Sequence, residues 1–463
     1  MPVILWTDAL IFLLLAVTVA FAWYARRHEH LRAPWRDVGK SRAAMGALVV
    51  LAAYVAIGLL DSVHFRKSLP VEPGQPARYA AEVSSALDVV LARLKTGTEK
   101  TYSSPFAIYL YARETVELPD GRSERRFVRL EHGGRRLDGA ATGRGLDLAR
   151  RAVPGAAKGL ALWLLLAAVM TLAARSSLPA LWREVNGMRW RTVFAALLAL
   201  AVLGGVLAEW SAGYHVFGTD KVGRDVLYQS LKSVRTGLVI GTLTTLVMLP
   251  FALALGAMAG YFGGRADDAI QYLYTTLNSI PSVLLIAAMV LMLNVYLDRH
   301  AAEFASAVER ADLRLLFLCL ILGLTSWTGL CRLLRGEALK LRETDYVLAA
   351  RALGATHTGI LVRHILPNVM HIVLIAVVLD FSGLVLAEAV LSYVQIGVDP
   401  TTDSWGNMIN SARLEMAREP VVWWSLAAAF VFMFALVLAA NLFADAVRDA
   451  FDPRLRGAMN RNS

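Results

Sequence analysis

The chain has 463 residues, of which 57% are hydrophobic, and its mean hydropathy is +0.51. This mean is too high for a soluble globular protein and indicates an integral membrane protein. The net charge of +10 is spread over loops between apolar segments, which fits orientation in a membrane better than nucleic-acid binding. The two cysteines, Cys319 and Cys331, form neither a disulfide framework nor a zinc-binding pattern, so we expect structural thiols.

Nine apolar segments are long enough to cross a bilayer. They are Ile4–Tyr24, Ala43–Leu60, Ala156–Ala174, Val193–Ala208, Leu238–Gly260, Ile270–Leu297, Leu315–Leu330, Val369–Leu391 and Val421–Leu442. The first has no Lys or Arg before it, which argues against a cleaved signal peptide. Every short, Arg-rich loop falls on one side if the N-terminus is outside and the C-terminus is cytoplasmic. The sequence therefore predicts an all-α polytopic membrane protein with about nine transmembrane helices.

One long polar stretch, residues 61–155, interrupts the N-terminal spans. Its apolar residues follow helical spacing from Val83 to Leu94, and Phe106–Leu118 and Arg125–Leu130 resemble strands joined by a turn at Pro119–Gly121. We expect a small α+β domain outside the cytoplasm. Its many Lys and Arg are compatible with that side because the positive-inside rule counts only short loops. It contains no catalytic constellation, and its charge predicts a solvated face, with a membrane or protein-docking surface as the alternative.

A distinctive motif, YHVFGTDKVGRDVLYQSL, follows the fourth span. Two glycines, Gly218 and Gly223, bracket a turn in it. Apolar residues from Val226 to Val234 then form one helical stripe, which predicts a helix lying on the outer membrane surface.

A second motif extends from Asp345 to Asn368 and predicts a short helix, a turn and the start of a span. Asp345 can cap the helix, and Pro367 can start the next one, where its missing N–H costs nothing. At helical spacing one face carries mostly small residues, which allow another protein's backbone to come close. The residues on this face are Tyr346, Ala349, Ala350, Leu353 and His357, with Gly354 beside them.

The first motif resembles the Phe-Gly-Thr-Asp, Gly-Arg-Asp signature of permease subunits of oligopeptide, dipeptide and nickel ABC importers. The matching residues are Phe217, Gly218, Thr219, Asp220, Gly223, Arg224 and Asp225. The second motif resembles the cytoplasmic coupling loop of ABC permeases. Its matching residues are Ala349, Ala350, Gly354, Leu366 and Pro367, with Leu348 at a position where the family often has Glu. Further matches lie in the segments 260–267, 397–408 and 441–454.

The resemblance covers roughly residues 214–454 and implies the domain organisation. Four parts are expected: residues 1–60 with two extra transmembrane helices, residues 61–155 as the extracytoplasmic domain, residues 156–190 with one extra helix and a basic cytoplasmic loop, and residues 191–463 as a six-helix permease domain whose coupling loop is 331–367. Residues 1–190 have no counterpart in the ordinary six-helix subunit.

The resemblance also implies partners and a location in the bacterial cytoplasmic (inner) membrane. The expected partners are a homologous second permease, two ATPase subunits, an extracytoplasmic solute-binding protein and the lipid bilayer, and no nucleic acid. The ATPases would act on Tyr346, Ala349, Ala350, Leu353, Gly354 and Pro367. Oligopeptides or dipeptides are the implied solutes, with nickel or another small solute as the alternative.

Other chemistry is not expected on this chain. It has no G-x-x-x-x-G-K-[ST], so ATP and Mg²⁺ should bind only to the partner ATPases, and no enzyme motif or metal site was found. His364 and His371 are separated by Pro367, which favours a structural role. A self-sufficient secondary transporter remains an alternative of another class, but such folds usually show internal repeats, and none was found.

Two polar residues inside predicted spans, Asp380 and Asn278, are candidates for the translocation path. A carboxylate at the bilayer centre costs about 2.5–3.5 kcal/mol, so Asp380 should face protein or a water-filled path. It can either hydrogen-bond a neighbouring helix as a structural contact or meet a positively charged part of the solute.

Overall fold

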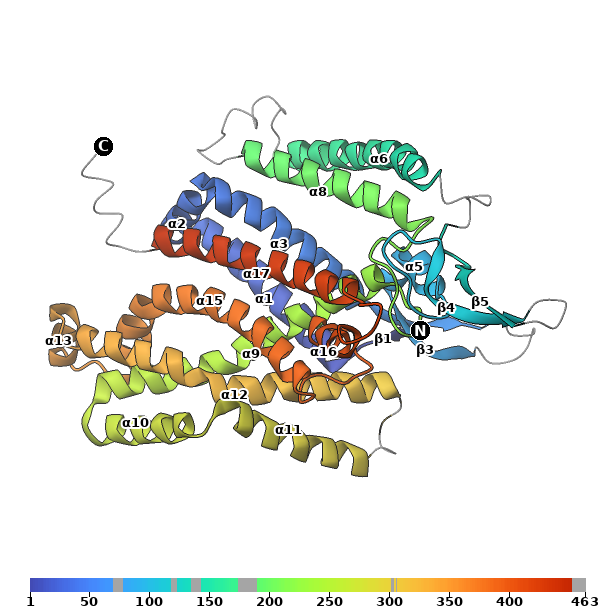
Figure 1. Cartoon of the computed structure of the whole chain (residues 1–463). Coiled ribbons are helices and arrows are strands. Elements are labelled where there is room, and N and C mark those ends of the chain that lie inside the picture. Colours follow the sequence, from blue (N-terminus) through green and yellow to red (C-terminus); the bar gives the residue numbers. More distant parts are fainter. Residues whose placement is uncertain are drawn as a thin grey trace. The chain divides into compact units, whose positions relative to one another are not determined.

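The computed structural model is mainly helical (Figure 1). It describes residues 1–69, 78–117, 123–134, 143–173, 190–300, 304 and 306–451. Within these ranges, nine helices are long and apolar enough to cross a membrane, which confirms the predicted fold class. The helices that contain these spans are α1 (Trp6–Arg27), α3 (Arg42–Asp61), α6 (Arg144–Ala173), α8 (Trp190–Ser211), α9 (Val226–Phe262), α11 (Ser282–Arg299), α12 (Ala307–Leu341), the continuous run His357–Tyr393, and α17 (Trp424–Phe451).

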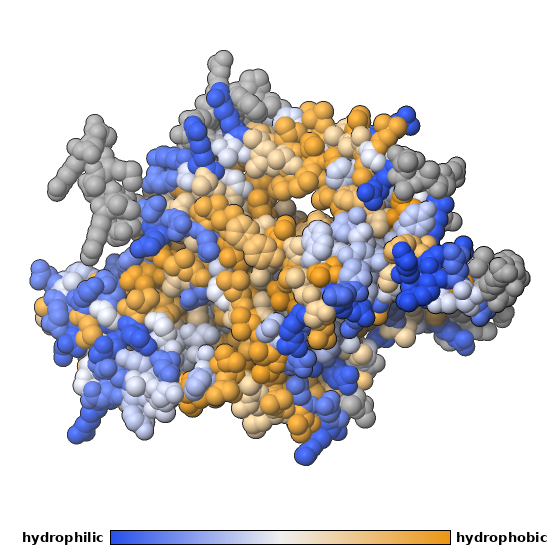
Figure 2. Space-filling view, in the orientation of Figure 1, coloured by the Kyte–Doolittle hydropathy of each residue, from blue (hydrophilic) through white to orange (hydrophobic). Residues whose placement is uncertain are grey.

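The surface has the distribution of side chains that a lipid environment requires. Figure 2 shows hydrophobic side chains along the lengths of the helices and hydrophilic side chains near many of their ends. Leu164 and Leu165 on α6, and Phe430 and Phe434 on α17, are among the large apolar side chains that are exposed. Exposed apolar area of this extent is unusual for a soluble protein and is expected where lipid covers it.

Contacts between residues divide the chain into two compact units, which are described separately. The first unit contains Met1–Val3, Arg36–Thr236 and Thr402–Ala439, and the second contains Ile4–Trp35, Gly237–Thr401 and Ala440–Ser463.

In the first unit, α6 and α8 pack along each other through glycines. A Cβ atom at Gly159 would lie 2.3 Å from the carbonyl oxygen of Ala201, and one at Gly205 would lie 2.3 Å from the carbonyl oxygen of Gly155. Small residues allow this backbone contact, as they commonly do between membrane helices. The Trp163 indole also donates a hydrogen bond to the Phe194 carbonyl at 2.9 Å, which joins the two helices.

The first unit also contains the expected small α+β region. A three-stranded antiparallel sheet has the order β1 (Pro2–Val3), β2 (His64–Ser68), β3 (Tyr79–Ser85), and β4 (Tyr109–Glu117) pairs with β5 (Ser123–Arg129) in a hairpin. The two predicted strands of the hairpin are present, whereas the turn predicted at residues 119–121 lies outside the described residues. Two short helices, α4 (Ala86–Val90) and α5 (Ala92–Thr96), follow β3.

Two details of this region differ from the prediction. Val83 belongs to β3 and not to a helix, because Ser85 caps α4 through a reciprocal hydrogen-bond pair with Asp88 and so fixes the helix start at Ala86. The N-terminal residues Pro2 and Val3 pair with Phe65 and His64, a pairing that no pattern in the sequence predicts.

The second unit is built around α9 and α12. Cβ atoms at Gly256 and Gly260 would lie 2.8 Å from the Cys331 carbonyl oxygen and 2.5 Å from the Arg335 carbonyl oxygen. Both cysteines are buried in apolar clusters of this unit, as expected for structural thiols. The remaining helices here are α2 (Glu29–Lys40), α10 (Gly264–Ser279), α13 (Asp345–Ala352), α14 (His357–Ile360) and α15 (Leu366–Tyr393), with α2 extending beyond Trp35 into the first unit.

The predicted helix on the outer membrane surface is wrong. Val226 to Val234 are the first turns of α9, which continues without a break to Phe262. Val226 and Val234 are fully buried, because protein and not a lipid surface covers this stripe.

The single span predicted at Ile270–Leu297 is also wrong, because it is two helices. α10 ends at Ser279 and α11 starts at Ser282. Pro281 disfavours the helical conformation of the residue before it, and Ile280 is accordingly extended, with φ −90° and ψ 128°.

The glycine contact between α6 and α8 predicts that the stability of the protein is sensitive to a larger residue at Gly159. Gly159→Ala should lower the free energy of unfolding by about 1–3 kcal/mol, because the added methyl group overlaps the backbone of α8. Gly204→Ala is the matched control, since a Cβ atom there meets nothing within 4 Å, and it should be neutral or slightly stabilising. Thermal unfolding of both variants in lipid nanodiscs checks this. Wild-type stability of Gly159→Ala would contradict the contact.

Candidate functional site

The motif at residues 345–368 begins with a short exposed helix, α13. Thr344 is its N-cap, with an extended backbone and a hydroxyl that donates to the Leu341 carbonyl, so the prediction that Asp345 is the cap is wrong. Asp345 instead occupies the first turn, where a carboxylate favours the positive end of the helix dipole.

Gly354 ends α13 in a way that only glycine does without strain. Its φ is +80°, and the Ala355 N–H bonds to the Ala350 carbonyl while the Gly354 N–H bonds to the Arg351 carbonyl. This pattern of a six-residue and a four-residue hydrogen-bonded turn is the Schellman motif. The Ala-Ala-x3-Gly spacing therefore places the two alanines near the C-terminal end of α13 and the glycine at the turn that ends it.

Side chains on α13 separate into one anchor and an exposed apolar set. Val347 is 1% exposed and lies in the apolar cluster of the second unit. By contrast, Leu353 is 88% exposed, and Tyr346 and Leu348 are also exposed. Val347 therefore fixes the helix, with Ala350 partly buried against the same cluster, whereas Tyr346, Leu348 and Leu353 are exposed.

Two polar contacts position this segment against its neighbours. The Tyr261 hydroxyl and the His357 Nδ1 atom are 2.8 Å apart, which joins the end of α9 to α14. The Asn368 amide donates to the Tyr346 hydroxyl at 3.2 Å, which joins α13 to the start of α15. Both ends of the motif are thus attached to spanning helices.

Pro367 lies in the first turn of α15, as predicted, but α15 continues from α14 and does not begin after a break in the helix. A π-helical turn at Leu361–Ile365 connects α14 to α15, and the Leu366 N–H bonds to the Leu361 carbonyl, five residues back. Proline lacks an N–H and its ring crowds the carbonyl four residues earlier, so a widened turn beside it relieves both problems. Such turns are rare and often mark functional sites.

The turn at residues 217–225 lies in the first unit and is held by the polar domain. The Thr219 hydroxyl donates to the Thr101 carbonyl at 2.8 Å, and the Ser103 N–H donates to the Thr219 hydroxyl at 2.7 Å. Gly218 and Gly223 have φ values of +70° and +76°. Their Cβ atoms would lie 2.3 Å from the Ser103 carbonyl oxygen and 1.7 Å from the Glu99 carbonyl oxygen, so no larger residue fits.

A buried cluster of two carboxylates and one imidazole lies under this turn. His215 Nδ1 is 2.7 Å from Asp225, and His215 Nε2 is 3.3 Å from Glu99. Glu99 also accepts backbone hydrogen bonds from Glu131, His132 and Gly133 at 2.8–3.0 Å. All three members of the cluster are buried.

The charges of this cluster determine its pKa values. Burial alone would lower the pKa of His215, but the hydrogen bonds and charges of Asp225 and Glu99 outweigh burial and raise it to about 9. Burial would raise the pKa of Glu99, but the bonds from His215 and the three backbone N–H groups lower it to about 2. The imidazole is therefore protonated and the carboxylate ionised at neutral pH.

A second ion cluster joins the same domain to α9. Lys232 Nζ lies 2.5 Å from Asp61 and 3.2 Å from Asp88, and the Tyr228 hydroxyl donates to Asp88 at 2.9 Å. Arg224, at the end of the turn, pairs with Asp403 through two contacts of 2.9 and 3.1 Å. The signature residues thus form the attachment point of several segments.

The two candidate path residues behave differently. The Thr328 hydroxyl donates to Asn278 at 3.0 Å, and Asn278 is exposed. Asp380 is half-buried, and the hydrogen bond expected for a structural contact is not found with any described residue. Both interpretations of Asp380 remain predictions.

The sequence did not predict the roles of Glu99 and His215, because no local pattern marks residues that meet 116 positions apart.

These features define a polytopic membrane protein of the transporter class, with an exposed helix between two spans and a folded domain on its signature turn. Residues 252–457 match the family described as "Binding-protein-dependent transport system inner membrane component". The chain belongs to this family.

Curated relatives support the same assignment. A dipeptide transport system permease protein of Lactococcus lactis is 30% identical over 240 residues, covering 52% of this chain and 64% of that protein. An oligopeptide transport system permease protein of Bacillus subtilis is 31% identical over 242 residues, covering 52% and 72%. A putative peptide permease protein of Brucella suis is 34% identical over 240 residues, covering 52% and 73%. The chain thus spans just under two thirds of the first relative and somewhat more of the other two.

A solved inward-facing methionine ABC transporter covers 48% of this chain and 96% of its own, at 18% identity and a TM-score of 0.35. This likeness is too weak for a comparison of folds.

The buried cluster predicts a pH dependence of stability. The pKa of His215 is raised from 6.5 to about 9, so its contribution is complete below pH 6.5 and is lost as the pH rises through 9. The pKa of Glu99 is lowered from 4.5 to about 2, so its contribution is present above pH 4.5 and is lost as the pH falls through 2. The melting temperature should therefore fall between pH 6.5 and 9.5.

His215→Gln isolates this effect. It should lower the melting temperature at pH 6 and flatten the alkaline decline, because the group that titrates is gone. His300→Gln is the control, since the His300 ring contacts Tyr296 and should leave the decline unchanged. An equally steep alkaline decline in His215→Gln would contradict the assignment of that decline to this cluster.

Proposed function

We propose that this chain is the permease subunit of an ATP-driven importer of dipeptides or oligopeptides in the bacterial cytoplasmic membrane. Its family is named for binding-protein-dependent transport. The relatives that are 30–34% identical carry the names of dipeptide, oligopeptide and peptide permeases. The chain itself is a transport subunit and catalyses no reaction.

The observation that carries the proposal is the exposed apolar set on α13. Tyr346, Leu348 and Leu353 project from a helix that one buried valine fixes to the core. Apolar side chains on a short helix between two spans are suited to a groove in a partner. The partner we propose is an ATPase subunit, which binds the ATP and Mg²⁺ that this chain has no motif to hold.

In the proposed mechanism, a movement of α13 is transmitted to the spanning helices through the hydrogen bonds that hold α13. Closure of two ATPase subunits would displace α13, and Tyr346 would transfer the displacement to Asn368 at the start of α15. The π turn before Pro367 is the element that can change conformation most easily in that helix, because its hydrogen bonds are already irregular. A second, homologous permease would complete the path, and an extracytoplasmic binding protein would deliver the solute.

The proposed orientation has the N-terminus outside and the C-terminus in the cytoplasm. Arg-rich short loops favour it. The pairing of β1 with β2 agrees with it, since the N-terminal residues then lie on the same side as the polar domain.

The coupling proposal predicts a loss of ATPase binding in Leu353→Glu. The side chain is 88% exposed, so the change should not affect folding, but it would bury an unpaired charge in the subunit contact. We expect at least a tenfold weaker association, about 1.4 kcal/mol or more, and no solute-stimulated ATP hydrolysis. Co-purification and ATPase assays of the assembled complex measure both.

Leu414→Glu is the matched control, because Leu414 is 70% exposed on α16 (Trp405–Glu415), away from the motif in sequence. It should leave ATPase association unchanged. Normal association and coupling in Leu353→Glu would overturn the role of α13. The same assay tests the solute class, since dipeptides, oligopeptides and Ni²⁺ can each be added with the binding protein.

The orientation predicts which single cysteines an impermeant maleimide reaches in whole cells with a permeabilised outer membrane. Val222→Cys, at a side chain that is 56% exposed, should react from outside. Lys340→Cys, at a side chain that is 72% exposed, should react only after the cytoplasmic membrane is opened. The two native cysteines are fully buried and give little background. The reverse labelling pattern would invert the topology.

A further inference from the structure

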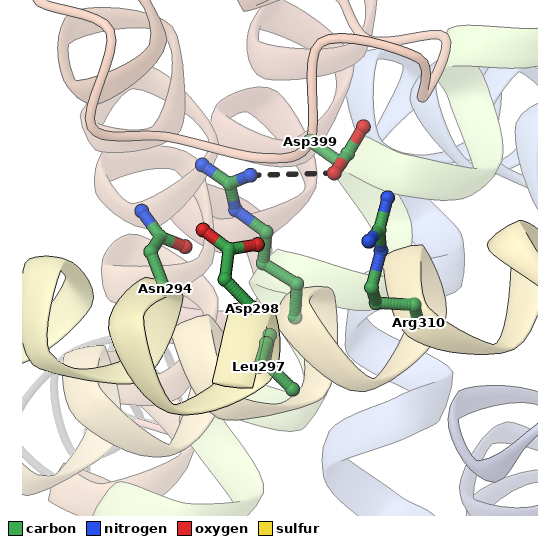
Figure 3. A pocket seen from close by; sticks show the side chains of 6 residues that line it. Asn294, Leu297, Asp298, Arg310 and Asp399 are labelled. Carbon is green, nitrogen blue, oxygen red and sulfur yellow. Dashed lines mark hydrogen bonds and ion pairs between the residues drawn. The ribbon is translucent and has the colours of Figure 1, made fainter. Parts of the chain in front are cut away.

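A polar cavity of about 200 Å³ lies in the second unit, between the end of α11, the start of α12 and the loop after α15. Figure 3 shows Asn294 and Asp298 on one wall, Arg310 on the opposite side, and Asp399 reaching in from the loop. Arg314 and Leu297 complete the lining. A volume of 200 Å³ corresponds to roughly seven water molecules, which is also enough for the backbone of a very short peptide.

The polar groups of this cavity are only partly satisfied. Arg314 Nη1 lies 3.3 Å from Asp399, but Arg314 Nε is buried without a hydrogen-bond partner. Asn294 Oδ1 is also buried without a partner. Within the described part of the chain, no hydrogen bond or ion pair is found for the guanidinium of Arg310. Two buried polar atoms without a partner beside one cavity call for an explanation.

The arrangement of these groups is dipolar. Asn294 and Asp298 are four residues apart on α11, and Arg310 and Arg314 are four residues apart on α12, so each pair shares one face of its helix. The α11 wall therefore offers oxygen acceptors and the α12 wall offers two guanidinium groups, of which that of Arg314 is paired with Asp399 and that of Arg310 is paired with none of the described residues. Guanidinium groups match the geometry of a carboxylate, and the oxygen acceptors suit an ammonium group.

The lining also restricts the charge of a ligand. Two arginines and two aspartates make the charge of the lining balanced, so a multiply charged anion such as phosphate would leave charge uncompensated in a partly buried site. A zwitterion with one carboxylate and one ammonium group compensates both walls. This argument favours a small zwitterion over a simple anion.

We infer that this cavity binds a small zwitterion that has the two termini of a short peptide. Its carboxylate would bind at Arg310, beside the Arg314–Asp399 pair, and its ammonium group at Asn294 and Asp298. The inference rests on the proposed function, because it assigns to this chain a contact with the transported solute. It adds that the permease itself recognises the solute's two termini.

Equilibrium binding of radiolabelled Ala-Ala to the full chain in lipid nanodiscs tests the inference without partner subunits. We expect saturable binding, at least tenfold weaker binding of Ala-Ala amide, which lacks the carboxylate, and at least tenfold weaker binding of N-acetyl-Ala-Ala, which lacks the ammonium group. This comparison of ligands uses only the wild-type protein, so it does not depend on the folding of a variant. Inorganic phosphate should not compete.

Arg310→Gln should weaken binding of Ala-Ala at least tenfold, and Arg299→Gln, an exposed arginine that does not line the cavity, should not. The inference is overturned by no saturable binding, which would assign the cavity to water, by equal affinity for Ala-Ala and its amide, or by competition from phosphate. Wild-type binding by Arg310→Gln would overturn it as well. Peptide-stimulated ATP hydrolysis of the assembled complex would still support the proposed function in each case, so the two failures are distinguishable.

Discussion

The buried contact of His215 with Glu99 and Asp225 is the constraint on which the first unit depends. Two carboxylates this close together in a buried site repel each other unless a positive charge lies between them. The imidazolium supplies that charge, and three backbone N–H groups complete the hydrogen bonding of Glu99. Removing any member leaves an uncompensated charge inside the protein, so the residues around the cluster must fold together.

This constraint changes how the N-terminal extension is understood. From the sequence alone, residues 1–190 are an N-terminal addition that has no counterpart in the ordinary six-helix subunit. In the structure, Glu99 belongs to the extension, His215 lies just before the signature turn, and Asp225 is the last residue of that turn. Gly218 and Gly223 lie so close to Ser103 and Glu99 that a side chain would overlap them. The polar domain and the signature turn thus form one structural element, and removal of residues 1–190 would leave His215 and Asp225 without Glu99.

Hydropathy and local spacing could predict a large part of this structure. The nine spans found among the described residues follow from apolar length, and the turn at Gly354 follows from the needs of a helix C-terminus. Features that depend on distant residues could not be predicted. The burial of Val226 and Val234 comes from segments that cover them, which no local pattern reveals. The π turn before Pro367 and the grouping of Asn294 with Arg310 likewise arise only when the helices pack.

Hydrogen exchange of backbone amides tests most directly whether the polar domain and the signature turn fold as one unit. The amides to compare are those of Glu131, His132 and Gly133, which donate to Glu99, and that of Thr219, which donates to Ser103. At pH 7 the account predicts that both sets exchange with the same opening free energy and that Glu99→Gln lowers both equally. If the Glu131–Gly133 amides exchange faster in that variant while Thr219 keeps its wild-type protection, the two segments open independently and the account is contradicted.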